Sequence, residues 1–376
     1  MACRVNLLSS LHDLAPCGPL YHRLVAAIQQ DAAVNPSQEL AQELDAIVAE
    51  AHTNLAATSL RCWRRLYTDA SIASALVSTP LDAIAKLDAA IIVSGAAGEG
   101  RLDLILDLIQ RIQQTISPFV DVKTPHDSEG NPITVLAAPP SLAAFQSREH
   151  KHPFILRAYA HHWPALTDRS WASTDYLRAV AGPGRVVPVE VGRDYRTDDW
   201  SQKLVLFDTF LAALDSTPDA EQPPLYLAQH SLLMQFPALR ADIEVPDYVY
   251  ADLPRPPGCA PPANDEQLVI NAWLGPGGTI SPAHTDPYFN TYVQVVGRKT
   301  VWMAPPRCGA GMYATGNTSG VDVFVAEHPE HPEFDSLVEE FAMRATLGPG
   351  DLLYMPAGWW HAMRAESRSF SVSMWF

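Results

Sequence analysis

The strongest constraint on the fold of this chain is a series of short apolar runs that begins near residue 150. Eight runs are rich in β-branched and aromatic residues, and glycine or proline turns separate them. They occupy residues 153–160, 185–191, 224–230, 267–275, 290–297, 299–306, 351–361 and 369–376. Many short strands at close spacing are typical of a sandwich or a barrel. The last run, SFSVSMWF, alternates large and small side chains, as expected for a strand of a barrel with space inside.

The chain up to about residue 116 follows a helical pattern instead. Apolar residues recur there at intervals of three and four. The segments with this periodicity are residues 21–30, 41–58, 80–93 and 101–116. A stretch rich in proline, glycine and polar residues follows, as in a linker. We therefore predict an α+β chain with an all-helical accessory domain (residues 1–125), a linker (126–140) and a β-rich domain (141–376).

Acidic residues outnumber basic ones in this chain. Its 376 residues include 42 Asp and Glu but 26 Lys and Arg, which gives a formal charge of −16 and a pI of about 5.1. Phosphate contacts need clustered basic residues, so this composition argues against direct nucleic-acid binding. It suits a basic protein or peptide partner, although the need for solubility also accounts for an acidic surface.

Cysteine content and hydropathy indicate where the protein resides. The five cysteines are scattered and form no Cys-x-x-Cys pair, which is typical of reduced thiols and argues against a zinc finger. The first residues lack a basic start followed by a long apolar run, and no run of 18 apolar residues occurs. We predict a soluble intracellular protein of the nucleus, the cytoplasm or both, without membrane contact.

A histidine and a carboxylate stand two residues apart in SPAHTDPYFN, where His284 precedes Asp286. On an extended backbone both side chains leave the same face, so they can reach one ion. A triad of two histidines and one carboxylate needs one more histidine, and it leaves positions open on Fe(II) for a substrate and dioxygen. We predict His361 as the third ligand, because it begins a strand after a Pro-Ala-Gly turn.

Two neighbouring segments bear on this site. The same histidine–acid spacing occurs twice in EHPEHPE, at His328 and His331, but this proline-rich acidic segment predicts a solvent-exposed loop without metal ligands. Between the proposed ligand segments, VQVVGRKTVWMAP predicts a hairpin that turns at residues 296–298, with Lys299 opening the returning strand. A lysine that points into a barrel is costly unless it meets an anion.

Together these segments resemble the Jumonji C (JmjC) branch of the Fe(II)- and 2-oxoglutarate-dependent oxygenases. The resemblance extends from about Ile133 to the last residue, and it rests chiefly on residues 270–306, 350–364 and 369–376. It implies a double-stranded β-helix, which is a cupin-like jelly roll with flanking helices. The first third of the chain resembles this branch only in its helical character.

The resemblance also assigns roles to individual residues. It implies that Fe(II) is bound by His284, Asp286 and His361. It implies that Lys299 pairs with the distal carboxylate of the cosubstrate 2-oxoglutarate. The residues that match hydrogen-bonding partners of the cosubstrate are Tyr226, Ser281 and Asn290.

The reaction implied by the resemblance is hydroxylation of arginine residues in a protein substrate, with consumption of 2-oxoglutarate and O2 and release of succinate and CO2. Six residues resemble those that receive the arginine side chain: Glu190, Tyr195, Trp200, Gln229, Trp273 and Trp375. A carboxylate pairs with a guanidinium group, and aromatic rings stack on it. Some of these residues also have simpler explanations, because the two last tryptophans suit a core and the glutamate suits a surface.

Three other functions compete with this interpretation. A histone N-methyl-lysine demethylase uses the same iron chemistry, and release of formaldehyde would identify it. A histone-tail peptidase lacks support, because the sequence shows no Ser-His or Cys-His arrangement and no separate zinc site. A non-catalytic JmjC binding module would most easily lose a member of the triad or Lys299, and all four are present. We expect a monomer, because no helical dimerisation element follows the last strand.

Overall fold

The computed structural model describes residues 17–30, 38–57, 61–113, 132–192, 196, 200–216 and 223–376. The chain forms two compact units, and neither is continuous in sequence. The helical unit comprises Met1–Phe119, Ala181–Val187 and Leu204–Thr209. The β-rich unit comprises Val120–Val180, Pro188–Lys203 and Phe210–Phe376. Residues 126–131 of the predicted linker lie outside the described residues, so the proposed domain boundaries stay a prediction.

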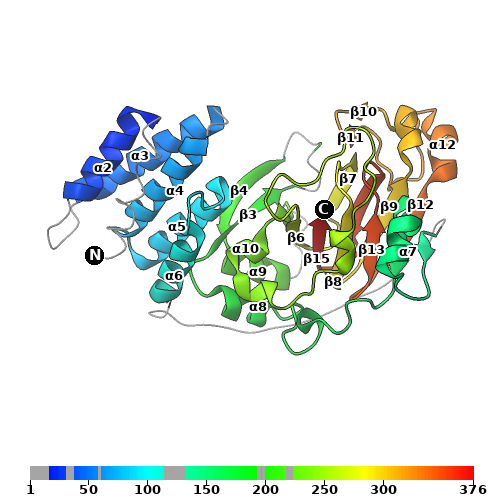
Figure 1. The fold of residues 1–376 in the computed structure, drawn as a ribbon, viewed down its shortest axis with the longest axis horizontal. Coiled ribbons are helices and arrows are strands. Elements are labelled where there is room, and N and C mark those ends of the chain that lie inside the picture. Colours follow the sequence, from blue (N-terminus) through cyan, green and yellow to red (C-terminus); the bar gives the residue numbers. More distant parts are fainter. Residues whose placement is uncertain are drawn as a thin grey trace. The chain divides into compact units, whose positions relative to one another are not determined.

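The helical part predicted from the apolar periodicity is confirmed (Figure 1). Its described helices are α2 (Pro19–Gln30), α3 (Gln38–Ala57), α4 (Arg61–Ala75), α5 (Pro80–Ser94) and α6 (Arg101–Gln113). Helix α5 shows why the boundaries fall where they do. Its first residue is a proline, which needs no hydrogen-bond acceptor for a backbone N–H, and Gly95 ends it with a left-handed backbone at φ 68°.

Buried ion pairs hold the helical unit together. Asp69 of α4 is fully buried and pairs with Arg65 at 2.7 Å and with Arg101 at 2.6 Å. Asp88 of α5 is also fully buried. Its carboxylate accepts hydrogen bonds from the Arg185 side chain at 2.7–3.0 Å and from the backbone N–H of Val186 at 2.9 Å. Since Arg185 is distant in sequence from α5, this pair fixes a separate segment to the helices of the same unit.

Two β-sheets form the second half of the fold, which confirms the predicted jelly roll (Figure 1). One sheet has nine strands, in the order β1 (Thr134–Val135), β2 (Phe154–Leu156), β13 (Leu352–Met355), β8 (Asn290–Val296), β15 (Ser369–Trp375), β6 (Val269–Gly275), β5 (Leu225–His230), β3 (Val186–Val191) and β4 (Ser201–Leu206). The other has six, in the order β10 (Ala314–Thr315), β11 (Thr318–Ser319), β7 (Ile280–Thr285), β14 (Trp360–Ala365), β9 (Lys299–Ala304) and β12 (Met343–Leu347). Short helices accompany them: α7 (Leu142–Ser147), α8 (Thr174–Ala181), α9 (Phe207–Asp215), α10 (Leu232–Gln235), α11 (Pro237–Arg240) and α12 (Phe334–Leu337).

Strand β15 lies in the middle of the larger sheet, between β6 and β8, and all its residues are buried. Its serines replace water as hydrogen-bond partners for buried polar side chains. Gln294 donates to Ser369 Oγ at 2.9 Å and accepts from Ser371 Oγ at 2.8 Å. Ser373 Oγ accepts a hydrogen bond from the indole N–H of Trp273 at 3.0 Å. These bonds satisfy the polar groups of the strand, so a serine-rich face is compatible with the core.

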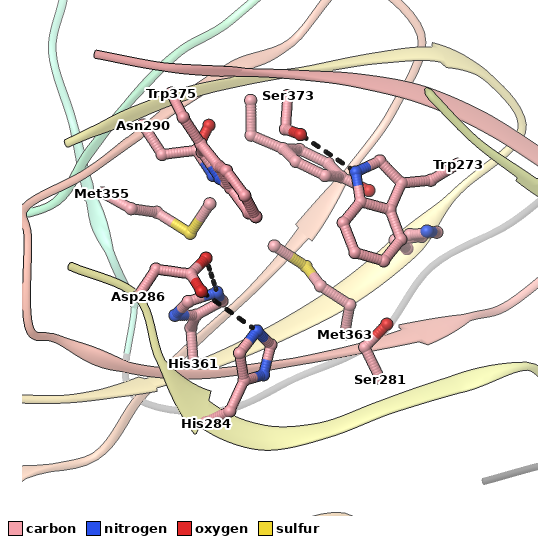
Figure 2. A pocket seen from close by; sticks show the side chains of 12 residues that line it. Trp273, Ser281, His284, Asp286, Asn290, Met355, His361, Met363, Ser373 and Trp375 are labelled. Atoms are coloured by element: carbon pink, nitrogen blue, oxygen red, sulfur yellow. Dashed lines mark hydrogen bonds and ion pairs between the residues drawn. The ribbon is translucent and has the colours of Figure 1, made fainter. Parts of the chain in front are cut away.

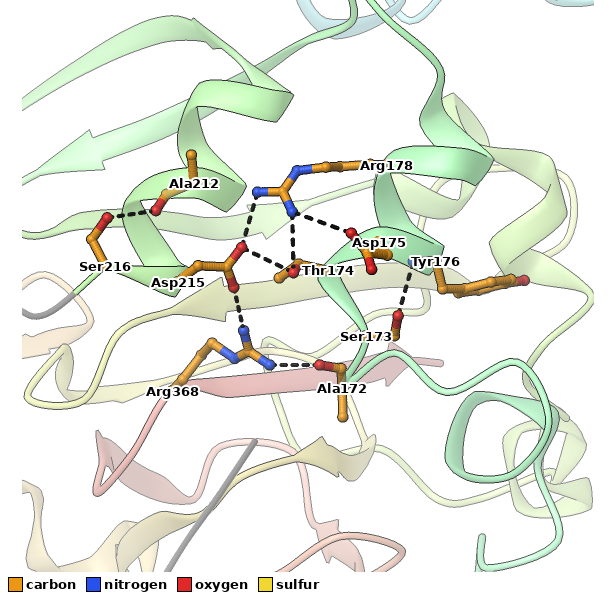
Figure 3. Close-up of polar contacts among 10 residues, drawn as sticks. All are labelled: Ala172, Ser173, Thr174, Asp175, Tyr176, Arg178, Ala212, Asp215, Ser216 and Arg368. Atoms are coloured by element: carbon orange, nitrogen blue, oxygen red, sulfur yellow. Dashed lines mark hydrogen bonds and ion pairs between the residues drawn. The ribbon is translucent and has the colours of Figure 1, made fainter. Parts of the chain in front are cut away.

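A network of charged residues connects α8, the end of α9 and the turn before β15 (Figure 3). The carboxylate of Asp215 accepts hydrogen bonds from Thr174, Arg178 and Arg368, each at 2.9 Å. Arg368 also donates to the carbonyl oxygen of Ala172 at 2.6 Å. Because several charges share one carboxylate, the network restrains these elements more than an isolated surface pair does.

No helix among the described residues combines the length and apolar character needed to cross a membrane. Four of the five cysteines fall in the described ranges, and each of these has a free thiol.

Candidate metal centre

The structure brings His284, Asp286 and His361 together between two neighbouring strands of the smaller sheet. His284 of β7 and His361 of β14 are directly opposite each other in an antiparallel pair. One ligand atom from each of the three side chains lies within 4.8 Å of the others. Asp286 lies 4.0 Å from Nε2 of His284 and 3.6 Å from Nε2 of His361 (Figure 2). Within the described residues, this is the cluster of histidine and carboxylate side chains that can surround one metal ion.

Backbone carbonyls fix the orientation of both imidazoles. Nδ1 of His284 lies 2.8 Å from the carbonyl oxygen of Pro282, and Nδ1 of His361 lies 3.1 Å from that of Trp359. A carbonyl oxygen only accepts, so Nδ1 carries the hydrogen and Nε2 keeps its lone pair for a metal. Burial, followed by the neighbouring His284, lowers the pKa of His361 to about 4. The imidazole is therefore neutral at physiological pH, which is the form that binds metals.

The backbone around the triad is also held from both sides. The amide N–H of Gly358 donates to the carbonyl oxygen of Asp286 at 2.8 Å. The backbone N–H of Thr285 donates to the carbonyl oxygen of Asn317, and the side-chain amide of Asn317 donates to the carbonyl oxygen of Thr285, each at 3.0 Å. Strand β11 thereby pairs with β7 opposite His284. Two imidazoles and one carboxylate on a restrained backbone fit a two-histidine, one-carboxylate iron site.

A cavity that is partly open to solvent lies beside the triad. Side chains from both sheets line it: Trp273, Ser281, His284, Asp286, Asn290, Tyr292, Lys299, Met355, His361, Met363, Ser373 and Trp375. Lys299 is 2% exposed and donates a hydrogen bond to the Tyr226 hydroxyl at 2.9 Å. No carboxylate of the described residues pairs with it, and burial lowers its pKa to about 7. A buried ammonium group without a counterion favours an anion in this cavity.

The three other residues proposed for cosubstrate binding surround the same cavity or its lysine. Ser281 of β7 and Asn290 of β8 line it. The Asn290 side-chain oxygen accepts from the backbone N–H of Met374 at 3.3 Å, which orients the amide. Tyr226 of β5 is buried against Lys299, and burial raises the pKa of its hydroxyl far above neutral pH. Its phenol therefore stays protonated and can donate a hydrogen bond.

The six residues proposed for the substrate arginine are less closely grouped. Trp273 and Trp375 line the cavity, and Trp375 stacks on Tyr288 with ring centroids 5.2 Å apart. Glu190 of β3 lies opposite Tyr226 in the β3–β5 pair. Glu190, Gln229 and Trp200 are not among the residues that line the cavity: Gln229 is exposed at a β-bulge with φ 48°, and Trp200 precedes β4. Tyr195 lies outside the described residues.

The prediction of a solvent-exposed loop at EHPEHPE is wrong for His328. Its side chain is 6% exposed and packs against Phe334 with ring centroids 4.4 Å apart. Its Nε2 lies 2.9 Å from the carbonyl oxygen of Asp322. The histidine thus helps to close a small core over the six-stranded sheet, and it is not part of the metal cluster.

Several residues that line the cavity are not predicted from the sequence. Tyr292 and Met363 could have been found, because each stands two residues after a proposed site residue on the same strand and so shares its face. Met355 enters the cavity because β13 pairs with β8, and Met355 lies opposite Asn290. That pairing joins segments far apart in sequence and has no local signal.

Comparisons with known proteins agree with this geometry. A family model described as a cupin-like domain matches residues 143–376, which include the triad and every residue that lines the cavity. Lysine-specific demethylase 8 of Danio rerio is 33% identical over 344 residues, which cover 84% of this chain and 81% of that protein. Jumonji C domain-containing protein 5 of Drosophila melanogaster is 40% identical over 247 residues, covering 63% of this chain and 58% of that protein. A more distant protein of Homo sapiens, named bifunctional peptidase and (3S)-lysyl hydroxylase JMJD7, is 26% identical over 260 residues, covering 60% of this chain and 77% of that protein.

Proposed function

We propose an activity on the premise that this chain belongs to the cupin-like JmjC-domain family: it is an Fe(II)- and 2-oxoglutarate-dependent hydroxylase of arginine residues in a protein substrate. Members of this family normally use Fe(II) and 2-oxoglutarate. The observation that carries the proposal is one cavity with a metal triad at one side and the unpaired ammonium group of Lys299 in its wall.

Each part of the cavity has a role in this proposal. His284, Asp286 and His361 hold the iron, and Lys299 pairs with the distal carboxylate of 2-oxoglutarate. Tyr226, Ser281 and Asn290 orient the cosubstrate by hydrogen bonds, which sets where its 2-oxo acid end lies. When bound, the iron with 2-oxoglutarate and O2 supplies the oxidising chemistry, which releases succinate and CO2 and adds one oxygen to a C–H bond.

Arginine is favoured as the target by the aromatic and acidic residues near the cavity. The Trp273 indole is held by Ser373, and the Trp375 indole is held by its stack with Tyr288, so both present fixed faces for a planar cation. Glu190 supplies a carboxylate on the neighbouring strand β3. The net charge of −16 favours the approach of a basic protein segment.

A lysine demethylase is the second candidate, because the name of the Danio rerio relative assigns that activity to a protein 33% identical to this chain. The same triad and cosubstrate site serve both reactions, so the substrate decides between them. The peptidase and the non-catalytic binding module stay alternatives, and the name of the human relative includes both a peptidase and a lysyl hydroxylase. A monomer, and a nuclear or cytoplasmic location, likewise stay predictions.

Mass spectrometry of peptides tests this proposal. Arginine and methyl-lysine peptides are incubated with the Fe(II)-loaded protein, 2-oxoglutarate and O2, beside a His284→Ala control. We expect one added oxygen on arginine, absent in the control. Loss of a methyl group with release of formaldehyde would establish the demethylase instead. If no succinate forms with any peptide, the binding module becomes the better interpretation.

A substitution at Glu190 tests the arginine pocket. We expect Glu190→Ala to abolish peptide hydroxylation and to leave 2-oxoglutarate binding intact, because the carboxylate pairs with the substrate and not with the cosubstrate. Glu190→Gln keeps the shape and removes the charge, so it separates packing from ion pairing. Loss of peptide and cosubstrate binding together would mean that Glu190 is structural.

A further inference from the structure

Tyr292 has a buried hydroxyl group in the wall of the cavity. The side chain is 3% exposed, and its hydroxyl forms no hydrogen bond within the described residues. Tyr292 stands two residues after Asn290 on β8, so both side chains leave the same face of the strand and line the cavity. Buried polar groups in folded proteins are almost always hydrogen-bonded, so this hydroxyl needs a partner that the described residues do not provide.

The neighbouring polar groups do not supply that partner. The Ser371 hydroxyl, which lies near Tyr292, already donates its single hydrogen to Gln294 Oε1 at 2.8 Å, so it has none left for the Tyr292 hydroxyl. Burial raises the pKa of the Tyr292 hydroxyl well above its ordinary value, so the group stays protonated and needs an acceptor. An acceptor in the cavity would satisfy it.

The surroundings of Tyr292 indicate the charge of that acceptor. The ammonium nitrogen of Lys299 lies 5.8 Å from the centre of the Tyr292 ring and 5.3 Å from that of Tyr226. Both tyrosines therefore border the place where an anion would pair with the lysine. A carboxylate has two oxygens, so it can accept hydrogen bonds from the lysine and from a second donor together.

We infer that the Tyr292 hydroxyl donates a hydrogen bond to the distal carboxylate of 2-oxoglutarate, beside the ammonium group of Lys299. This inference rests on the proposed function and adds a binding residue to it. The hydroxyl selects for a 2-oxo acid with a terminal carboxylate, because a cosubstrate with an apolar end would leave both donors without partners.

Calorimetry with the full-length protein tests the inference, using Mn(II) in place of iron and excluding O2. Tyr292→Phe removes the hydroxyl and keeps the ring. We expect its dissociation constant for 2-oxoglutarate to rise about tenfold or more, which is the effect of losing one hydrogen bond to a charged group. The ligand-free variant should melt at the same temperature as the wild type or higher, because the substitution removes an unsatisfied polar group.

Tyr354→Phe is the matched control. Tyr354 is also fully buried, but it does not line the cavity, and its hydroxyl donates to the carbonyl oxygen of His150 at 3.0 Å. We expect this variant to melt at a lower temperature and to bind 2-oxoglutarate like the wild type. A similar loss of stability in ligand-free Tyr292→Phe would show that the hydroxyl has a partner within the protein, and the inference would then be wrong.

Lys299→Met separates failure of this inference from failure of the proposed function. If Lys299→Met loses 2-oxoglutarate binding while Tyr292→Phe binds like the wild type, the cosubstrate site stands and Tyr292 is not part of it. If the wild type and Lys299→Met bind 2-oxoglutarate equally weakly, the cosubstrate site itself is wrong. Weakened binding in both variants supports the inference.

Discussion

The ammonium group of Lys299 lies in a cavity wall, where it donates a hydrogen bond to the Tyr226 hydroxyl and lies within 6 Å of the ring centres of Tyr226, Trp273 and Tyr292. Burial lowers its pKa from 10.5 to about 7, so half of the ligand-free molecules carry a neutral lysine at that pH. The unfolded chain binds this proton more tightly than the folded protein, so the lysine makes the free energy of unfolding rise with pH between about 7 and 10.5. A bound carboxylate reverses the shift, because an opposite charge favours the protonated form.

Binding of 2-oxoglutarate should therefore be coupled to proton uptake. At pH 8 the ligand-free lysine is mostly neutral, and it gains a proton when the carboxylate arrives. We expect the affinity to fall by up to about tenfold for each pH unit above 7. Calorimetry in buffers with different ionisation enthalpies measures the protons taken up. Lys299→Arg keeps its charge at all these pH values, so it should bind without proton uptake. Absence of uptake in the wild type would contradict the prediction.

The residues of the site differ in how far the sequence predicts them. His284 and Asp286 lie together because a strand places alternate residues on one face, and that rule needs no knowledge of the fold. His361 lies beside them only because its strand pairs with the strand of His284, and no local pattern predicts pairing between segments so far apart in the sequence. The burial of His328 was not predictable from composition, because the short helix α12 that covers it has no strong pattern.

The hairpin between β8 and β9 shows how one element can depend on one glycine. Gly297 lies in its two-residue turn and has a φ of 67°. A Cβ atom at this position would overlap the carbonyl oxygen of Arg368, which follows β14. The sequence predicts the turn from its Val-Gly-Arg pattern, but the close approach of the β14–β15 connection appears only in the structure.

Gly297→Ala should destabilise the β-rich unit strongly. The left-handed backbone costs about 1 kcal/mol for alanine, and the overlap with a backbone atom adds about 1–3 kcal/mol or more. Gly278→Ala is the matched control, because Gly278 also has a positive φ, 85°, but no atom lies near a Cβ built there. We expect urea unfolding to show a loss of about 1 kcal/mol for the control and a clearly larger loss for Gly297→Ala. Equal losses would show that the connection moves aside freely.

Elements with a regular period were predictable, and short or polar ones were not. The predicted segments match, to within a few residues, the strands β8, β9 and β15 and the helices α3, α5 and α6. Helix α4 lies outside the predicted segments, because its buried face consists largely of small and polar residues around the Asp69 ion pairs. The hairpin of β10 and β11 is too short to show alternation, although it pairs with β7 at His284.

At the scale of the whole molecule, the compact units do not follow the chain from one end to the other. The change from helical to strand-like patterns predicts two kinds of structure. It does not predict that Ala181–Val187 and Leu204–Thr209 belong to the helical unit. The reason is that Asp88 and Arg185 are 97 residues apart, and no local pattern reveals that they pair.

A double-mutant cycle at this pair tests its role. We expect Asp88→Leu or Arg185→Met alone to lower the free energy of unfolding by about 3–5 kcal/mol, because each leaves a buried charge without a partner. The double variant should recover a large part of that loss, since both charges are removed. Chemical denaturation of the full-length protein measures all four species. Additive losses would mean that the two side chains do not depend on each other.

The position of the two imidazoles on directly opposed residues of β7 and β14 has a consequence for assembly of the protein. A slip of either strand by one residue would turn one imidazole to the opposite side of the sheet and separate it from its counterpart. On the proposed function, only molecules in which these two strands pair in the correct register would bind iron, so metal content would distinguish them from a misaligned form.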